Sequence, residues 1–357
     1  MDKSKEKLIV DFFAKFDIKM EVLGITCGAT YSLFELGFSG KTKLVTLAKI
    51  VASVDDLAIA LSVENVRIVP ISVKNAVGFE VPNNERTWVD FDSLTDSLEV
   101  SKELRIPVAL GKDVKDKPII IDLASCAHIL VCGNPGTGKT MFYNSLICSI
   151  LRTKSAEEVS FAIIDTKGVE LAVYNGDSHL LLPVITNVSE VFDFLDNLLI
   201  EMDKRIKLFN EVGVRNIEDY NCWISERISG GQDLGQRKLP YIVVLVDEFS
   251  ILMMEDGKRF ETLIKQITAS AKFCGIHLVI STNKCSADVI TGVIKSNFPS
   301  KIALAVSSSL NSWIVLDGID AEKLLGSGDM LVCMSGWEKT IRVQGALVDV
   351  TKELQGK

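Results

Sequence analysis

The feature that most constrains the fold is a glycine-rich segment, GNPGTGKT at 133–140, placed between two apolar runs. The first run, 129–132, has the composition of a buried strand, and the second, 141–151, is apolar and helix-forming. A strand, a glycine-rich loop and a helix in this order form a P-loop. The glycines let backbone N–H groups curl around phosphate oxygens, and the helix directs the positive end of its dipole at the same anion.

The P-loop predicts a site for ATP and Mg²⁺. We expect Lys139 to reach the β- and γ-phosphates and the Thr140 hydroxyl to bind Mg²⁺. A chance glycine-rich turn is the alternative, but strand, loop and helix all occur in the required order. The residues expected to contact the nucleotide are Gly133, Asn134, Pro135, Gly136, Thr137, Gly138, Lys139, Thr140 and Met141.

Two later strands are expected to deliver polar side chains to the same site. The apolar run 241–246 ends in Asp247 and Glu248, at the strand end where open α/β sheets bind ligands. We expect Asp247 to hold Mg²⁺, directly or through water, and Glu248 to activate the attacking water. The strand 276–282 is followed by Asn283, a candidate sensor of the γ-phosphate. An exposed acidic pair and a simple turn cap are the alternatives.

The charge pattern limits how nucleic acid can bind. A net charge of −8 argues against a protein coated in basic surface, so a contact with nucleic acid requires a local positive cluster. The segment 284–301 carries Lys284, Lys295 and Lys301, with Asp288 as its only acid. This pattern suits phosphate contact, and an ordinary solvated face is the alternative.

The predicted fold class is α/β, with about two domains in a chain of 357 residues. From residue 106 onward strands and helices alternate, which predicts a mostly parallel sheet. We expect an N-terminal helix at 1–19, a small α+β domain at 20–95 and a P-loop ATPase domain at 96–357.

Several local patterns make finer predictions. The range 43–61 has the spacing of one helix, and Asn75 suits a turn between two strands. The polar stretch from 82 to 105 predicts a connector, and 341–348 predicts a strand at the sheet edge. The segment 229–235 has the composition of a surface loop.

Targeting and metal patterns are not found in this sequence. None of the eight cysteines forms a Cys-x-x-Cys pair, so a zinc site is not expected. No uncharged apolar run reaches about 18 residues, which predicts no stable membrane insertion and a cytoplasmic protein. The apolar positions in 4–16 indicate a helix docked on its own domain, with a membrane-surface helix as the alternative.

Longer motifs point to one family. They are VGFEVPN (77–83), IIDTK (163–167) with Glu170 and Leu171, GVRN (213–216) with Tyr220 and Asn221, PYIVVLVDEF (240–249), GIHL (275–278), DVITG (288–292) and LLGSGDML (324–331). With the P-loop, these stretches make the chain resemble the motor of the FtsK/SpoIIIE DNA translocases from about residue 7 to residue 350.

The resemblance implies a RecA-like ATPase that assembles as a hexameric ring and moves double-stranded DNA through its centre. Residues up to about 95 are similar to the family's smaller α domain, a lever on the ATPase domain. Lys284 and Lys295 fall where the family places DNA-contacting pore residues.

The chain departs from the family pattern at several positions. The family's Thr-Gln-Arg-Pro is Thr-Asn-Lys-Cys at 282–285, and the trans-acting arginine is replaced by Lys272, with Arg259 as an alternative group. Ser309 stands at a pore-side lysine and Trp313 at another arginine. The loop before Asp247 is shortened, and the sequence given has no counterpart of the family's membrane-anchored region or winged-helix domain. These departures suit a phage or mobile-element motor.

Two other functions compete with DNA translocation. Related motors drive secretion and conjugation, although those usually carry tandem ATPase domains or membrane helices. The substitutions at Lys272 and Trp313 also leave open an ATP-dependent assembly protein that hydrolyses weakly. Stimulation of ATP hydrolysis by long duplex DNA separates the translocase from both alternatives.

Overall fold

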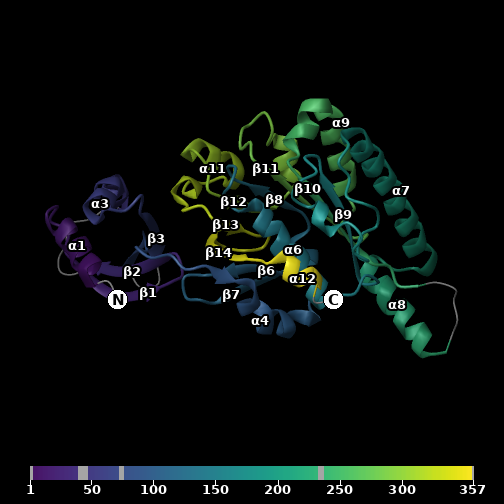
Figure 1. Cartoon of the computed structure of the whole chain (residues 1–357), viewed down its shortest axis with the longest axis horizontal. Coiled ribbons are helices and arrows are strands. Elements are labelled where there is room, and N and C mark those ends of the chain that lie inside the picture. Colours follow the sequence, from purple (N-terminus) through teal and green to yellow (C-terminus); the bar gives the residue numbers. More distant parts are fainter. Residues whose placement is uncertain (1–2, 39–46, 72–75, 232–236, 356–357) are drawn as a thin grey trace.

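The computed structural model of the chain describes residues 3–38, 47–71, 76–231 and 237–355. Two β-sheets organise these residues, a four-stranded sheet near the N-terminus and a ten-stranded sheet in the remainder (Figure 1). The expected turn at Asn75, the start of the 43–61 helix and most of the 229–235 loop lie outside the described residues.

The small sheet is antiparallel, with strand order β1-β2-β4-β3. Its strands are β1 (Met20–Cys27), β2 (Tyr31–Phe38), β3 (Arg67–Ile71) and β4 (Ala76–Pro82), and its helices are α1 (Lys3–Ala14), α2 (Leu47–Ala52) and α3 (Val54–Leu61). The predicted single helix over 43–61 is therefore interrupted at Ser53. Ile9 and Phe13 of α1 are buried against this sheet, as expected for a docked helix, whereas Leu8 and Phe16 are exposed.

The large sheet has the order β7-β6-β14-β13-β12-β8-β11-β10-β9, and β5 pairs with β14. The strands are β5 (Val89–Asp90), β6 (Pro107–Lys112), β7 (Pro118–Asp122), β8 (Ile129–Cys132), β9 (Val159–Asp165), β10 (Tyr241–Asp247), β11 (Ile276–Thr282), β12 (Ser300–Leu304), β13 (Asp329–Cys333) and β14 (Ile341–Leu347). The five strands from β12 to β9 are parallel, and β13, β14, β6 and β7 extend the sheet by antiparallel pairing.

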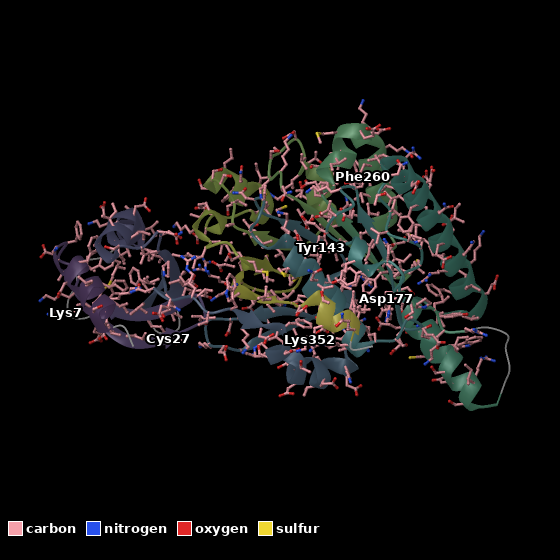
Figure 2. All side chains as sticks on the ribbon, in the orientation of Figure 1. Lys7, Cys27, Tyr143, Asp177, Phe260 and Lys352 are labelled. Atoms are coloured by element: carbon pink, nitrogen blue, oxygen red, sulfur yellow. The ribbon has the colours of Figure 1, made fainter. Side chains whose placement is uncertain are left out.

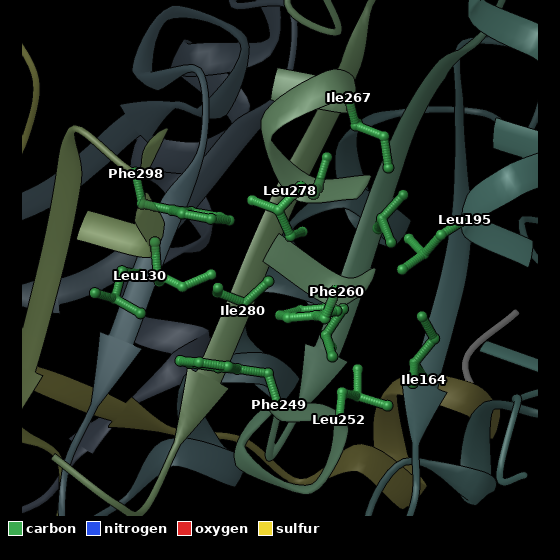
Figure 3. Packing of buried hydrophobic residues seen from close by; sticks show 14 of the residues in the cluster. Leu130, Ile164, Leu195, Phe249, Leu252, Phe260, Ile267, Leu278, Ile280 and Phe298 are labelled. Atoms are coloured by element: carbon green, nitrogen blue, oxygen red, sulfur yellow. The ribbon is translucent and has the colours of Figure 1, made fainter. Parts of the chain in front are cut away.

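Helices cover both faces of the large sheet. The helices described in this part of the chain are α4 (Thr95–Val100), α5 (Leu123–Cys126), α6 (Lys139–Thr153), α7 (Val188–Val212), α8 (Ile217–Ser229), α9 (Ser250–Thr268), α10 (Gly292–Asn297), α11 (Ser309–Leu316) and α12 (Val350–Gln355). Leu195 of α7 and Phe260 of α9 pack on one face (Figure 3), while Phe142 and Leu146 of α6 pack on the other. Burial on both faces explains why the parallel strands are continuous apolar runs.

Two predictions about this part of the chain are wrong. The strand predicted at the edge, β14, lies inside the sheet because the β6–β7 hairpin pairs beyond it. The predicted polar connector contains β5, a 3₁₀ turn at Phe91–Leu94 and α4. Phe91, Leu94 and Leu98 are buried there, since their apolar side chains fill a small cluster with Ala346 and Val348.

An ion network joins the two sheets. Arg342 of β14 is 2% exposed and donates to Asp329 at 2.6 and 2.9 Å and to Glu80 of β4 at 2.8 Å. The Arg342 guanidinium also lies 4.0 Å from the centre of the Tyr31 ring. Arg67 of β3 pairs with the same Glu80 at 3.1 Å. Buried ions are tolerated only when fully paired, so these contacts fix the small sheet against the large one.

Candidate active site

The glycine-rich loop follows β8, between its neighbours β11 and β12, and leads directly into α6. Gly136 and Gly138 have φ of 74° and 116°, a region that favours glycine. A Cβ on Gly138 would lie 2.7 Å from the backbone nitrogen of Gly328, and that nitrogen donates to the Thr137 carbonyl at 2.7 Å. The backbone of the loop therefore requires a glycine at position 138.

The two reactive side chains of the loop are held by protein groups. The Lys139 ammonium donates to the carbonyls of Gly133 at 2.6 Å and Asn134 at 3.0 Å. Burial lowers the pKa of Lys139. The Thr140 hydroxyl donates to the carboxylate of Glu170. Both side chains lie at the start of α6, where a phosphate would also meet the helix dipole.

Asp247 is the last residue of β10 and is 6% exposed. Its carboxylate accepts a hydrogen bond from Ser281 of β11 at 2.8 Å. Burial raises the pKa of Asp247, and the hydrogen bond from Ser281 opposes that rise. Tyr143 of α6, near the middle of the molecule in Figure 2, donates to the Val246 carbonyl at 2.9 Å. This bond ties the end of β10 to the P-loop helix.

Glu248 has φ of 56°, so its side chain leaves the strand end from a left-handed backbone conformation. Its carboxylate accepts from Ser250 at 2.6 Å, from Thr282 at 2.7 Å, and from the backbone and side-chain nitrogens of Asn283. Lys167 lies 3.5 Å away. Burial by itself would raise the pKa of Glu248, but these donors and the Lys167 charge outweigh it and lower that pKa.

The residues proposed from the P-loop and the strand ends thus meet at the carboxyl edge of the parallel strands. Asn283 belongs to this group through its contacts with Glu248. The sequence reasoning missed two side chains as site residues, Lys167 and Glu170, which follow β9. The sequence signal that could have identified them is the polar end of β9. This strand runs parallel to β10 and beside it, so both strands end at the same edge of the sheet.

The donor set suits a magnesium nucleotide. Mg²⁺ prefers oxygen ligands and is usually held by one or two protein oxygens together with phosphates and water. Thr140 and Asp247 offer a hydroxyl and a carboxylate, and no described residues form a cluster of three or more His, Cys, Asp or Glu side chains that could hold a metal ion alone. Beside these oxygens, the backbone of Gly328 leaves no room for a side chain at position 138 of the glycine loop.

An apolar pocket of about 200 Å³ adjoins the glycine loop on its α6 side. Its lining includes Gly136, Gly138, Met141, Phe142, Trp88 and Leu347. A nucleoside base is flat and largely apolar, so the pocket lies where the base of a bound nucleotide could be held. Met141, expected from the sequence to contact the nucleotide, is one of the residues that line this pocket.

Lys272 lies away from this edge. It belongs to the turn between α9 and β11, and its ammonium donates to the Ser125 carbonyl, just before β8, at 3.2 Å. It therefore lies at the amino-terminal edge of the sheet, opposite the P-loop. Arg259, the alternative group, pairs with Asp196 of α7 at 2.7 Å. Neither side chain joins the nucleotide site of its own chain.

The proposed DNA-contacting lysines are both paired. Lys284 lies 2.5 Å from Asp288, and Lys295 and Lys301 each lie 2.7 Å from Asp317 at the end of α11. The positive patch expected from the sequence, with Asp288 as its only acid, is weaker than predicted because the fold adds Asp317. Trp313, which stands where the family has an arginine, is exposed on α11.

Comparisons with known families identify the family of the chain. The FtsK/SpoIIIE family model matches residues 93–287, and the FtsK alpha domain model matches residues 2–83. The chain belongs to the FtsK/SpoIIIE family. In the part of the chain that the structure describes, no helix combines the length and apolar character needed to cross a membrane.

The FtsK/SpoIIIE relatives are longer proteins. The chain is 42% identical to the DNA translocase FtsK of Treponema pallidum over 350 residues, which is 98% of this chain and 43% of the relative. It is 43% identical to that of Bacillus cereus over 338 residues, 94% of this chain and 42% of the relative. The chain thus spans less than half the length of these curated relatives.

Solved structures agree on the fold of this family member. The pCW3 conjugation coupling protein TcpA, in a monomer form with ATPγS, has a TM-score of 0.65 at 21% identity. The match covers 99% of this chain and 99% of that one. The cytoplasmic domain of the Thermomonospora curvata type VII secretion ATPase EccC has a TM-score of 0.58 at 23% identity, over 69% of this chain and 29% of that one. The large sheet therefore has the fold of P-loop ATPase motor domains.

Proposed function

We propose that this FtsK/SpoIIIE chain is an ATP-hydrolysing motor that moves double-stranded DNA. The observation that carries the proposal is the meeting of Lys139, Thr140, Asp247 and Glu248 at one edge of the sheet. These are the side-chain types that phosphoryl transfer requires. The curated relatives are named DNA translocases, which supports DNA as the substrate on which the motor acts.

The residues divide the work of hydrolysis. The backbone N–H groups of the loop bind the phosphates, and Lys139 exchanges its two carbonyl acceptors for phosphate oxygens. Thr140 and Asp247 would hold Mg²⁺, and the ion would supply neutralisation of the phosphate charge. Glu248 orients the attacking water and accepts its proton. Asn283 holds the Glu248 carboxylate in place, beside the position of the γ-phosphate.

The assembly and the DNA contact are further parts of this proposal. A ring of subunits, hexameric by family resemblance, places Lys284 and Lys295 on the DNA path and Lys272 at a neighbour's nucleotide. The proposed domains are 1–19, 20–95 and 96–357, acting in the cytoplasm. The division between the small domain and the ATPase domain is supported by two family models, which match on either side of residues 84–92.

The test is the rate of ATP hydrolysis with and without long duplex DNA, measured at several salt concentrations. We expect stimulation by DNA of any sequence and a steep loss of stimulation with salt, because the contacts are to phosphates. Glu248→Gln should bind ATP and hydrolyse it about 100-fold or more slowly, as expected for loss of a general base. Parental hydrolysis by Glu248→Gln would contradict the role given to that residue.

Matched lysine variants locate the DNA contact. Lys284→Ala combined with Lys295→Ala should reduce the stimulation by DNA. Lys204→Ala combined with Lys207→Ala removes the same amount of charge from the exposed side of α7. This control variant should retain the stimulation by DNA. Hydrolysis that DNA never stimulates would instead favour a secretion or assembly ATPase.

A further inference from the structure

A short turn after β9 contacts both halves of the nucleotide site. It begins at Asp165, which is fully buried at the end of the strand. The Asp165 carboxylate accepts four backbone hydrogen bonds of 3.0 to 3.1 Å, from Lys167, Gly168, Glu170 and Leu171. A buried carboxylate that binds four N–H groups fixes the backbone of the turn. The two charged side chains of the turn are therefore presented from a rigid base.

Glu170 faces the P-loop half of the site. Its carboxylate accepts a hydrogen bond from the Thr140 hydroxyl. A hydroxyl has one proton and two lone pairs, so a hydroxyl that donates to a carboxylate keeps its lone pairs for another partner. That partner in the proposed function is Mg²⁺. Glu170 thus stands behind the metal ligand, in the place where outer partners commonly orient ligands.

Lys167 faces the half of the site that contains Glu248. Its ammonium lies 3.5 Å from the Glu248 carboxylate and is the only positively charged group that the described residues pair with that acid. The remaining donors to Glu248 are neutral groups of Ser250, Thr282 and Asn283. The Lys167 side chain is 39% exposed, whereas that of Glu248 is 7% exposed.

We propose that the turn at 166–171 is a third component of the nucleotide site, beside the P-loop and the acidic end of β10. In it, Glu170 orients the Thr140 hydroxyl toward the metal, and Lys167 holds Glu248 toward the attacking water. Both are positioning residues that act through another side chain. This inference rests on the proposed ATP hydrolysis, and its tests separate the two.

The Glu170 role is tested by Mg²⁺ titration of the complex with a fluorescent ATP analogue. Glu170→Ala should bind the analogue as the parent does in excess chelator, but require about 10-fold more Mg²⁺ for the metal-dependent change. Glu170→Gln keeps an acceptor for the Thr140 proton and should restore most of the metal affinity. Glu170 is exposed, so both variants should fold.

A double-mutant cycle shows whether Glu170 acts through Thr140. Thr140→Val removes the hydroxyl that Glu170 contacts. Glu170→Ala added to Thr140→Val should cause little further loss of Mg²⁺ affinity, because the contact is already gone. Additive losses, or unchanged Mg²⁺ dependence in Glu170→Ala alone, would overturn the role of Glu170.

The Lys167 role is tested by steady-state kinetics. Lys167→Met should lower kcat about 10-fold and leave KM for ATP nearly unchanged, because only the orientation of Glu248 is lost. Lys167→Arg keeps a charge and should recover part of the rate. An unchanged kcat in Lys167→Met would overturn this half of the inference. A parent protein that neither binds nor hydrolyses MgATP would instead overturn the proposed function itself.

Discussion

Burial in this fold changes the pKa of two histidines, His128 and His277. His128, just before β8, and His277 of β11 are 3% and 1% exposed, and their rings lie 6.4 Å apart. Burial lowers the pKa of His128 to about 3, with further lowering by His277 and Lys272. Burial also lowers the pKa of His277 to about 4, although its bond to the Ala127 carbonyl opposes the change. Both histidines are therefore neutral in the folded chain.

Buried neutral histidines make the fold sensitive to acid. The unfolded chain takes up these protons below a pKa of about 6.5, whereas the folded chain does not until about pH 4 or below. Stability is therefore fully present above pH 6.5 and is lost as pH falls below it, by roughly 1 kcal/mol per histidine at pH 5.5. Urea unfolding at pH 7.5 and 5.5 measures this, and His128→Gln with His277→Gln should show a smaller difference. An equal difference in both proteins would contradict the assignment.

At the scale of elements, the extension of the sheet depends on one glycine. The β6–β7 hairpin pairs with β14 at Gly111, whose φ is 142°. A Cβ on Gly111 would lie 2.0 Å from the carbonyl oxygen of Gln344, a backbone atom that cannot move aside. The serines of α6 then fix the hairpin, since Ser145 donates to Ala109 and Ser149 accepts from it.

Gly111→Ala should destabilise the chain by about 3 kcal/mol or more, because it combines a backbone clash with an unfavourable φ. Gly257→Ala is the matched control, since its Cβ would meet only the flexible end of Met253 at 3.6 Å. That change lies in α9 and should be neutral or stabilising by up to about 1 kcal/mol. Urea midpoints of the two variants give the comparison, and equal midpoints would refute the steric argument.

At the scale of the whole molecule, Lys272 and the P-loop lie at opposite edges of the large sheet. Lys272 lies at the opposite edge of the sheet from Lys139. In the proposed ring, a cation at this edge would meet the nucleotide of a neighbouring subunit rather than that of its own chain. In ring ATPases such a cation is usually an arginine worth about a thousandfold or more in rate, and a lysine keeps the charge without the planar fork.

Subunit mixing tests this arrangement. Lys272→Ala should bind ATP and hydrolyse it very slowly, as should Glu248→Gln. A mixture of the two should regain part of the activity, because some interfaces then pair an intact Glu248 with an intact Lys272. Full activity of Lys272→Ala alone would remove Lys272 from the mechanism and point to another group, such as Arg259.

The sequence by itself determined the elements whose signals are local. The bounds of β8 and β11 are those expected from their apolar runs. The P-loop and the two acids at the end of β10, Asp247 and Glu248, were also predictable. A parallel strand delivers its last residues to one common edge, so position along the chain is enough to bring them together.

The tertiary structure alone decided what depends on contacts between distant residues. The interior place of β14 follows from a hairpin more than 200 residues earlier in the chain. Asp317, at the end of α11, weakens the lysine patch because it pairs with Lys295 and Lys301. Lys167 and Glu170 become site residues only because β9 lies beside β10 and α6 faces the turn. Periodicity and composition report which face of an element is buried, but not which side chains of other elements it meets.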